Sequence, residues 1–168
     1  MQWDNVRFDF AGARVLVTGG TGGLGGGIAE AFRTAGADVT ITGTRATAAD
    51  YDYDLTGFGY RQLDVENKAA IDALAASVPK LDILFNSAGL ALMMLGLDEY
   101  DPDTFERAVA MHLTGVYRLA ARLQPVLSQS QRPGGASIVC MASMSSLFGI
   151  EMVPGYGAGK TGLVGMIR

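Results

Sequence analysis

Cysteine and histidine are almost absent from this sequence, which has one residue of each among 168, Cys140 and His112. A lone cysteine cannot form an internal disulfide and is typical of reducing compartments, so we expect a cytoplasmic protein. One cysteine and one histidine cannot supply the four ligands of a zinc site built from nitrogen and sulfur. We therefore predict that the chain binds no metal.

Long apolar runs and clusters of positive charge are missing as well. The longest apolar stretch, GLALMMLGL (89–97), is far shorter than the roughly 20 residues that cross a bilayer. The opening MQWDNVRFDF lacks the basic region and apolar run of a signal peptide. The formal net charge is −4 and no lysine or arginine cluster offers a local exception, which argues against nucleic acid as a partner. We expect neither a membrane nor a nucleic-acid partner.

The residues that are abundant are apolar residues and glycine. Hydrophobic residues make up 49% of the chain, charged residues 18%, and there are 23 glycines. A chain of 168 residues is long enough to bury one sizeable core. We see no internal repeat and no linker, so we predict a single domain over residues 1–168.

Apolar periodicity divides the chain into alternating strands and helices. The predicted strands are 13–18, 38–43, 60–65, 81–89 and 137–143. The predicted helices are 23–36, 67–78, 101–127 and one that begins near Pro154. Such alternation is typical of right-handed βαβ units, and hence of an α/β fold with a parallel sheet covered on both faces. The polar loop 43–59 is expected at the surface.

The first strand runs into a glycine-rich turn, TGGTGGLG (18–25). Glycine permits positive φ and lets a backbone contact a pyrophosphate at the start of the next helix. Flexible loops can look similar, but a turn between the first strand and helix predicts dinucleotide binding. Gly26 and Gly27 lie inside the predicted helix, where each costs about 1 kcal/mol relative to alanine. This cost suggests that a cofactor or a neighbouring strand packs closely there.

The stretch GYGAGKTG (155–162) has two interpretations. A P-loop needs four residues between its first glycine and GK[ST], whereas only three separate Gly155 from Gly159. The P-loop is therefore excluded. The alternative is that Tyr156 and Lys160, four residues apart, share one face of a helix.

The motifs together resemble one family. TGGTGGLG, LDV, FNSAG, IVCMASMSS and YGAGK occur in the order and spacing of the short-chain dehydrogenase/reductase family. The resemblance covers essentially the whole chain from FDFAGARVLVTGG onward. It implies a Rossmann fold, a doubly wound parallel sheet with strand order 3-2-1-4-5 as far as the chain extends. Two further strands and a substrate-covering loop of the family have no counterpart, so we expect a truncated or cleaved product, or part of a longer protein.

The resemblance also implies a site for a nicotinamide dinucleotide. The family's cofactor positions correspond here to Gly19, Gly23, Leu24, Gly25, Asp64, Val65, Asn86, Ala88 and Gly89. NAD-preferring members carry an acidic residue at the end of the second strand, to bond the ribose 2′-hydroxyl. Gly43 stands there in this sequence and is followed by Thr44 and Arg45. The cofactor is therefore predicted to be NADP(H), with NAD(H) as the alternative.

The family's catalytic residues fall on Ser143, Tyr156 and Lys160, with the serine thirteen residues before the tyrosine. A tyrosine with an ordinary pKa of about 10 is a poor base near neutrality. The charge of Lys160 would favour the phenolate, and its ammonium could also bond the cofactor's ribose and thus bind the cofactor together with Tyr156. Ser143 would bond the substrate oxygen. The implied reaction interconverts an alcohol and a ketone, small-molecule partners of the protein. The alternative function is a non-catalytic nucleotide-binding or interaction module.

His112 departs from the family, which usually has asparagine at this position of the long helix. The asparagine normally holds a water that completes a proton path to the lysine. His112 could hold that water, or carry protons itself near neutral pH, in which case it is catalytic. The other interpretation is a partly buried histidine bonded to a backbone carbonyl.

Two further expectations concern surfaces. Five methionines could form an adaptable apolar pocket, although we favour ordinary core positions for most of them: Met93, Met94, Met141, Met144 and Met152. Without a sixth strand, 137–143 becomes an exposed sheet edge, and the last helix often forms subunit contacts in the family. We therefore expect a homo-oligomer, and expect a chain ending at Arg168 to self-associate, bind the cofactor's adenine half weakly and turn over little.

Overall fold

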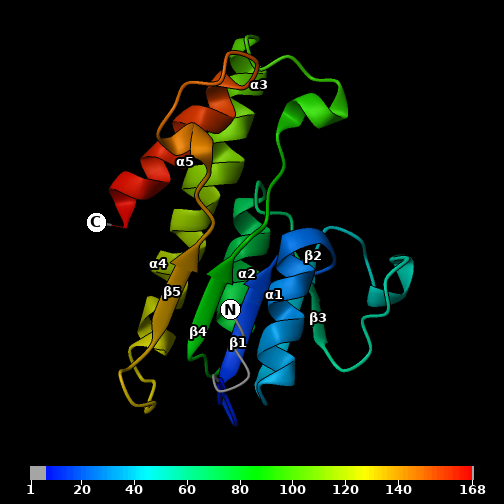
Figure 1. The fold of residues 1–168 in the computed structure, drawn as a ribbon, viewed down its shortest axis with the longest axis vertical. Coiled ribbons are helices and arrows are strands. Elements are labelled where there is room, and N and C mark those ends of the chain that lie inside the picture. The colour runs from blue at the N-terminus through cyan, green and yellow to red at the C-terminus, as the bar shows by residue number, and fades with distance from the viewer. Residues whose placement is uncertain (1–6, 168) are drawn as a thin grey trace.

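A computed structural model describes residues 7–167 of the chain. Most of the opening segment judged unlike a signal peptide therefore lies outside the described residues. Five strands form one parallel sheet in the order β3-β2-β1-β4-β5 (Figure 1). They are β1 (Arg14–Thr18), β2 (Asp38–Gly43), β3 (Gly59–Gln62), β4 (Ile83–Asn86) and β5 (Ser137–Cys140). The predicted fold class and strand order are confirmed.

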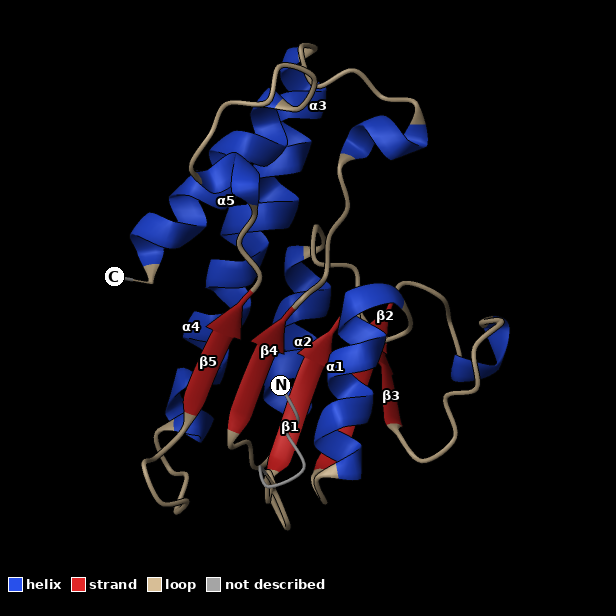
Figure 2. Cartoon of the chain, in the orientation of Figure 1, coloured by secondary structure: helices blue, strands red, loops and turns tan. Residues whose placement is uncertain are grey.

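The helices cover both faces of this sheet. They are α1 (Gly23–Thr34), α2 (Lys68–Ser77), α3 (Pro102–Val109), α4 (Gly115–Leu127) and α5 (Pro154–Met166). In Figure 2, α1 lies in front of the sheet and α2 and α4 lie behind it, while α3 and α5 pack together beyond the strand ends. The helix predicted over 101–127 is present but contains a π-helical turn, Ala110–Thr114, between α3 and α4.

The buried side chains of β1 supply both cores, because successive residues of a strand point to opposite faces. Val15 and Val17 pack with Ala29 of α1 on one face. On the other face, Leu16 lies in a cluster with buried leucines and isoleucine of α2, β4 and α4. The continuous apolar run of β1 is thus explained by burial on both sides.

The strands are shorter than the sequence pattern predicts. β3, β4 and β5 end at Gln62, Asn86 and Cys140, several residues before the predicted ends. The register of β4 with β5 ends at the pair Asn86–Cys140. The residues that follow leave the ladder and form turns at the carboxyl edge of the sheet, which is the edge at which open α/β sheets bind ligands.

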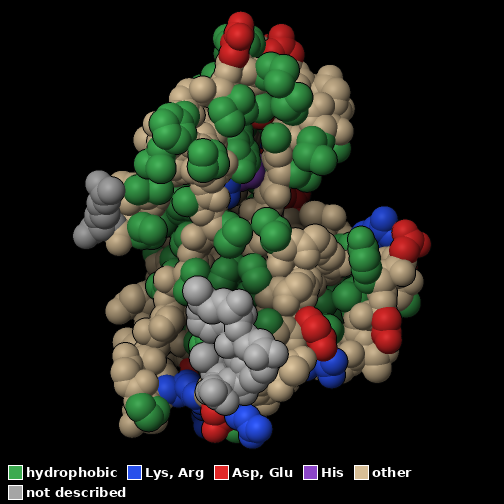
Figure 3. Space-filling model, viewed as in Figure 1, with side chains coloured by type: hydrophobic (Ala, Val, Ile, Leu, Met, Phe, Trp, Pro, Cys, Tyr) green, Lys and Arg blue, Asp and Glu red, His purple; other side chains and the backbone are tan. Residues whose placement is uncertain are grey.

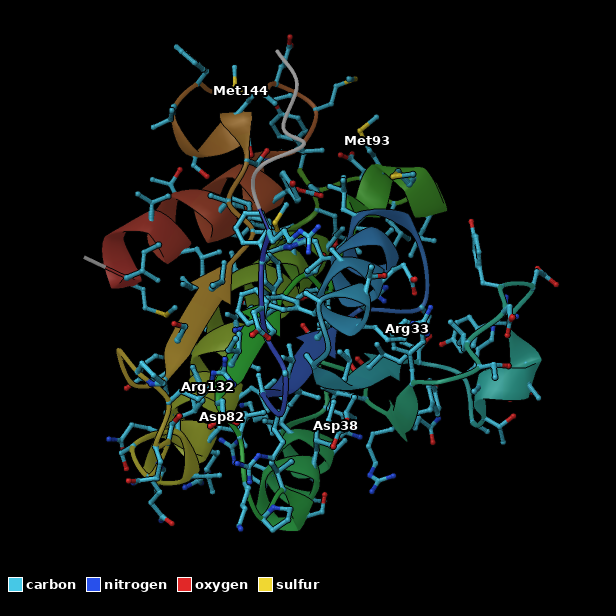
Figure 4. The ribbon with its side chains drawn as sticks, turned by 60° about the horizontal axis from the view of Figure 1, so that its bottom comes forward. Arg33, Asp38, Asp82, Met93, Arg132 and Met144 are labelled. Carbon is cyan, nitrogen blue, oxygen red and sulfur yellow. The ribbon has the colours of Figure 1, made fainter. Side chains whose placement is uncertain are left out.

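β5 forms one edge of the sheet, as expected, and its apolar side chains are open to solvent. Ile138 is 44% exposed and Val139 39% exposed. The expectation that most of the five methionines occupy core positions is wrong. Met93, Met94, Met144 and Met152 are all exposed and Met141 is half-buried. Met93 and Met144 project from separate segments at the same end of the molecule (Figure 4).

Residues 7–167 contain neither a candidate membrane span nor a candidate metal cluster. None of their helices combines the length and apolar character that a membrane crossing requires. Nor does this part of the chain bring three or more His, Cys, Asp or Glu side chains together in a way that could hold a metal ion.

Candidate active site

The glycine-rich turn between β1 and α1 has a backbone that only glycine adopts easily. Gly19 has a φ of 67° and Gly23 a φ of 54°. At Gly25, a Cβ would overlap the carbonyl oxygen of Gly19, so α1 can approach the turn only without a side chain there. At Gly27 a Cβ would meet no atom within 4 Å, so no neighbouring strand explains that glycine.

The first turn of α1 suits an anionic ligand. No side chain caps this helix, and its first turn contains no acidic residue. Uncapped amides at a helix N-terminus, together with the helix dipole, favour a phosphate group. This turn and the bare glycine backbone before it are the observations that fit a dinucleotide pyrophosphate.

The hydroxyl of Thr18 joins this turn to the turn that follows β4. It accepts hydrogen bonds from the amides of Ser87 and Ala88, both at 3.2 Å. A Cβ on Gly19 would stand 2.7 Å from the Cα of Ala88. The two turns are therefore packed backbone to backbone at the carboxyl edge of the sheet.

Tyr156 and Lys160 lie one turn apart on α5. The Nζ of Lys160 is 5.7 Å from the centre of the Tyr156 ring. Lys160 is only 7% exposed, and its ammonium donates a 2.6 Å hydrogen bond to the carbonyl oxygen of Met141. Burial lowers the pKa of Lys160 below its ordinary value.

His112 lies in the π-helical turn, against the face of α5 that carries Tyr156. The two rings meet edge to face, with centres 4.6 Å apart. Glycines make room for the imidazole, since a Cβ on Gly89 would stand 2.7 Å from its Nδ1 and a Cβ on Gly159 2.9 Å from its Cβ. π-Helical turns are frequent at functional sites because they redirect side chains within a helix.

The protonation of His112 follows from its surroundings. The side chain is 1% exposed, and its Nε2 lies 3.0 Å from the carbonyl oxygen of Leu90. A carbonyl oxygen only accepts, so Nε2 carries the proton and Nδ1 is an acceptor. Nδ1 has no hydrogen-bond partner among residues 7–167.

Desolvation by burial, and next the charge of Lys160, lower the pKa of His112 to about 4. The expectation that His112 titrates near neutral pH came from the ordinary histidine value and does not hold in this environment. The hydrogen bond to a backbone carbonyl, foreseen in the other interpretation, is present.

One cleft of about 460 Å³ brings most of these groups together. The sequence-predicted residues that line it are Gly19, Gly23, Leu24, Gly25, Ala88, Gly89, His112, Tyr156 and Lys160. Figure 3 shows a hollow in the upper half of the molecule, flanked by apolar side chains. Met94 and Met141 also line the cleft.

Six predicted residues do not line this cleft: Thr44, Arg45, Asp64, Val65, Asn86 and Ser143. Ser143 directly follows Ala142, which does line the cleft, and its hydroxyl accepts a 3.2 Å hydrogen bond from the amide of Ser145. Asp64 accepts a hydrogen bond from the amide of Glu66. The buried side-chain amide of Asn86 donates a 3.6 Å hydrogen bond to the sulfur of Cys140.

Of the remaining three predicted residues, Val65 follows β3, and Thr44 and Arg45 follow β2. The guanidinium of Arg45 lies 4.8 Å from the centre of the Tyr51 ring and donates to the carbonyl of Asp50. The Tyr51 hydroxyl in turn accepts a 3.0 Å hydrogen bond from the amide of Arg45. A Cβ on Gly43 would overlap that hydroxyl, so no larger residue fits at the end of β2 while Tyr51 holds this position.

Two residues around the site are not evident from the sequence alone. Tyr51 lies in the polar loop 43–59, and the only local signal for its position is the absence of a side chain at Gly43. Glu99, whose buried carboxylate accepts a 2.7 Å hydrogen bond from the amide of Tyr156, gave no signal at all. It lies 57 residues earlier in the chain and belongs to no motif.

The chain is similar to known oxidoreductases over nearly all of its length. A family model described as short chain dehydrogenase matches residues 13–168. D-threitol dehydrogenase of Mycolicibacterium smegmatis is 34% identical over 98% of this chain and 66% of its own length. A 2-dehydro-3-deoxy-L-rhamnonate dehydrogenase (NAD(+)) of a Sphingomonas strain is 30% identical over 95% of this chain and 65% of its own.

Solved structures agree with the sequence comparisons. The Pseudomonas aeruginosa RhlG/NADP active-site complex superposes with a TM-score of 0.79 at 28% identity, covering 95% of this chain and 64% of that one. The chain thus spans slightly less than two thirds of the length of these relatives.

Proposed function

The chain belongs to the short-chain dehydrogenase/reductase family, and from this premise we propose that it forms the cofactor-binding part of an NAD(P)(H)-dependent oxidoreductase. The reaction is the interconversion of an alcohol and a ketone. The observation that carries the proposal is the single cleft that joins the glycine-rich turn to Tyr156 and Lys160. A helix end suited to a phosphate group and the pair proposed for proton transfer line the same cleft, which supports the proposal.

Different residues of the cleft would bind different parts of the cofactor. The uncapped amides at Gly23, Leu24 and Gly25 would hold the pyrophosphate, because they are donors at the positive end of α1. Lys160 would hold the ribose hydroxyls through its ammonium. A nicotinamide cofactor held there would supply or accept the hydride.

We assign the transfer of the proton to and from the substrate oxygen to Tyr156. Its hydroxyl donates to the carbonyl oxygen of a ketone during reduction and takes the proton back during oxidation. The ammonium of Lys160, 5.7 Å from the ring centre, stabilises the phenolate by its charge. Ser143 would donate a hydrogen bond to the same substrate oxygen after a rotation of its side chain away from Ser145.

His112 acts in this scheme as a neutral acceptor. The His112 side chain is 1% exposed and lines the cleft, and its unpartnered Nδ1 would accept a hydrogen bond from a water molecule between it and Lys160. Such a water would complete the proton path to the lysine, as the water held by asparagine does in the family. With a pKa of about 4, the imidazole does not itself carry protons near pH 7.

The experiment that tests the proposal is Tyr156→Phe in the full-length protein. It should abolish turnover and leave cofactor affinity, measured by fluorescence titration, within about threefold, since the phenol contributes little to pyrophosphate binding. Tyr117→Phe is the matched control, because Tyr117 is exposed on α4 and does not line the cleft. Turnover by Tyr156→Phe would show that the Tyr156 hydroxyl is not the proton donor. Cofactor binding by the wild type with no turnover on any alcohol or ketone would instead favour a non-catalytic module.

For the cofactor we propose NADP(H) over NAD(H). Gly43 leaves no carboxylate at the end of β2 to bond the ribose 2′-hydroxyl or repel a 2′-phosphate, and Arg45 supplies a positive charge two residues later. NADPH should therefore bind more tightly than NADH, and Arg45→Ala should remove most of the difference. Arg61→Ala, at an exposed arginine on β3, is the control. Equal or reversed affinities in the wild type would contradict this preference.

A further inference from the structure

Glu99 is a buried carboxylate at the junction of two segments. It is 1% exposed. Its Oε2 accepts a 2.7 Å hydrogen bond from the amide of Tyr156, and its Oε1 accepts a 3.2 Å bond from the amide of Leu92. A buried carboxylate is costly unless its oxygens are satisfied, and here each oxygen has one backbone donor.

On one side, Glu99 completes the start of α5. That helix begins at Pro154, and Val153 before it gives no side-chain cap. The first-turn amides of a helix have no partner within the helix itself. Glu99 accepts the bond from the third residue of α5, which is Tyr156. Its negative charge also lies at the positive end of the helix dipole.

On the other side, Glu99 holds a wall of the cleft. Leu92 begins the short 3₁₀ turn Leu92–Leu95, and its neighbours Leu90, Ala91 and Met94 line the cleft. The same carboxylate therefore joins this wall to the helix that carries Tyr156. Glu99 bridges the wall and the tyrosine through one backbone amide of each.

The residues that flank Glu99 reinforce the junction. The hydroxyl of Tyr100 donates a 2.7 Å hydrogen bond to the carbonyl of Glu151, in the loop that leads into α5. Asp101 caps α3 through the amide of Thr104 at 2.9 Å. Three consecutive side chains thus hold α3, the approach to α5 and the cleft wall in one arrangement.

We propose that Glu99 is a positioning residue, which sets the hydroxyl of Tyr156 against the cleft wall by bonding the amides of Tyr156 and Leu92 together. The proposal rests on the function proposed above for Tyr156. Glu99 does not line the cleft and so does not touch substrate or cofactor. Its effect passes through the backbone of the two segments.

The test compares Glu99→Gln with Glu106→Gln in the full-length protein. Glutamine keeps the size of the side chain, but its amide nitrogen is a donor and cannot accept from either backbone N–H, so one of the two bonds is lost. Glu106 is an exposed glutamate on α3 and serves as the matched control. Glu99→Asp is the second variant, because it keeps the charge and shortens the reach by one methylene.

Three quantities separate positioning from a general loss of structure. Amide hydrogen exchange should accelerate at least tenfold in Glu99→Gln at whichever of residues 92 and 156 loses its acceptor, and should stay unchanged at both in Glu106→Gln. NADPH affinity should stay within about twofold. Because Glu99→Gln would displace the Tyr156 hydroxyl without removing it, kcat should fall about 10- to 100-fold in this variant while KM changes little. Glu99→Asp should show the same pattern to a smaller degree.

Several results would overturn the proposal. One is unchanged exchange at both residue 92 and residue 156 in Glu99→Gln. Another is an unchanged kcat despite faster exchange. A third is a parallel fall of kcat, cofactor affinity and folded fraction, in both Glu99→Gln and Glu99→Asp. A wild type without turnover would refute the proposed function separately, and exchange at residues 92 and 156 would still decide whether Glu99 joins them.

Discussion

Lowering the pH from 8 to 5 should destabilise the fold through His112. Burial lowers the pKa of this imidazole to about 4 in the folded chain, against about 6.5 for an ordinary histidine. The unfolded chain therefore binds the proton first as the pH falls. The contribution of His112 to stability is complete above pH 6.5 and is lost progressively as the pH approaches 4.

The size of the effect follows from the difference between the two pKa values. At about 1.4 kcal/mol per pH unit, the whole difference corresponds to about 3 kcal/mol of unfolding free energy. At pH 5 the folded imidazole is still mostly neutral while the unfolded one is mostly charged. About 2 kcal/mol should therefore be lost between pH 8 and pH 5. The side chain is 1% exposed, so solvent screens this contribution little.

Urea unfolding of the wild type and of His112→Asn at both pH values measures this contribution. Asparagine does not titrate, and the other ionisable groups are common to both proteins. The wild type should lose about 2 kcal/mol more than the variant between pH 8 and pH 5. A difference below about 0.5 kcal/mol would refute the argument that burial keeps His112 neutral. The same pKa predicts that the pH–rate profiles of the wild type and of His112→Asn have the same shape near pH 6–7.

Two further predictions concern glycines and the sheet edge. Gly25→Ala should lower the free energy of unfolding in urea by about 1–3 kcal/mol and weaken cofactor binding, because its Cβ would overlap the Gly19 carbonyl. Gly27 is exposed and a Cβ there would meet no atom within 4 Å, so Gly27→Ala should raise the free energy of unfolding by at most about 1 kcal/mol. A larger loss of stability in Gly27→Ala than in Gly25→Ala would contradict this packing. A polypeptide of these 168 residues should self-associate through β5, and Val139→Lys should shift it toward monomer in sedimentation velocity. Equal association of both proteins would rule out that edge.

The sequence by itself determined the order of the elements and the two ends of the site. Apolar runs broken by glycine and proline are local signals, so β1, β2 and the helices fall close to their predicted bounds. The glycine turn and the Tyr156–Lys160 spacing are also local, and the fold places both on one cleft. The strand order followed from resemblance rather than from any local pattern.

Tertiary structure decided what depends on contacts between distant segments. The ends of β4 and β5 depend on where their shared ladder stops, and the exposure of Met94 depends on which side of its turn faces the cleft. Glu99 reaches Tyr156 across 57 residues, so no local pattern could reveal the bond. The pKa of His112 is likewise a property of its enclosure, because desolvation and the charge of Lys160 exist only once the chain has folded around the imidazole.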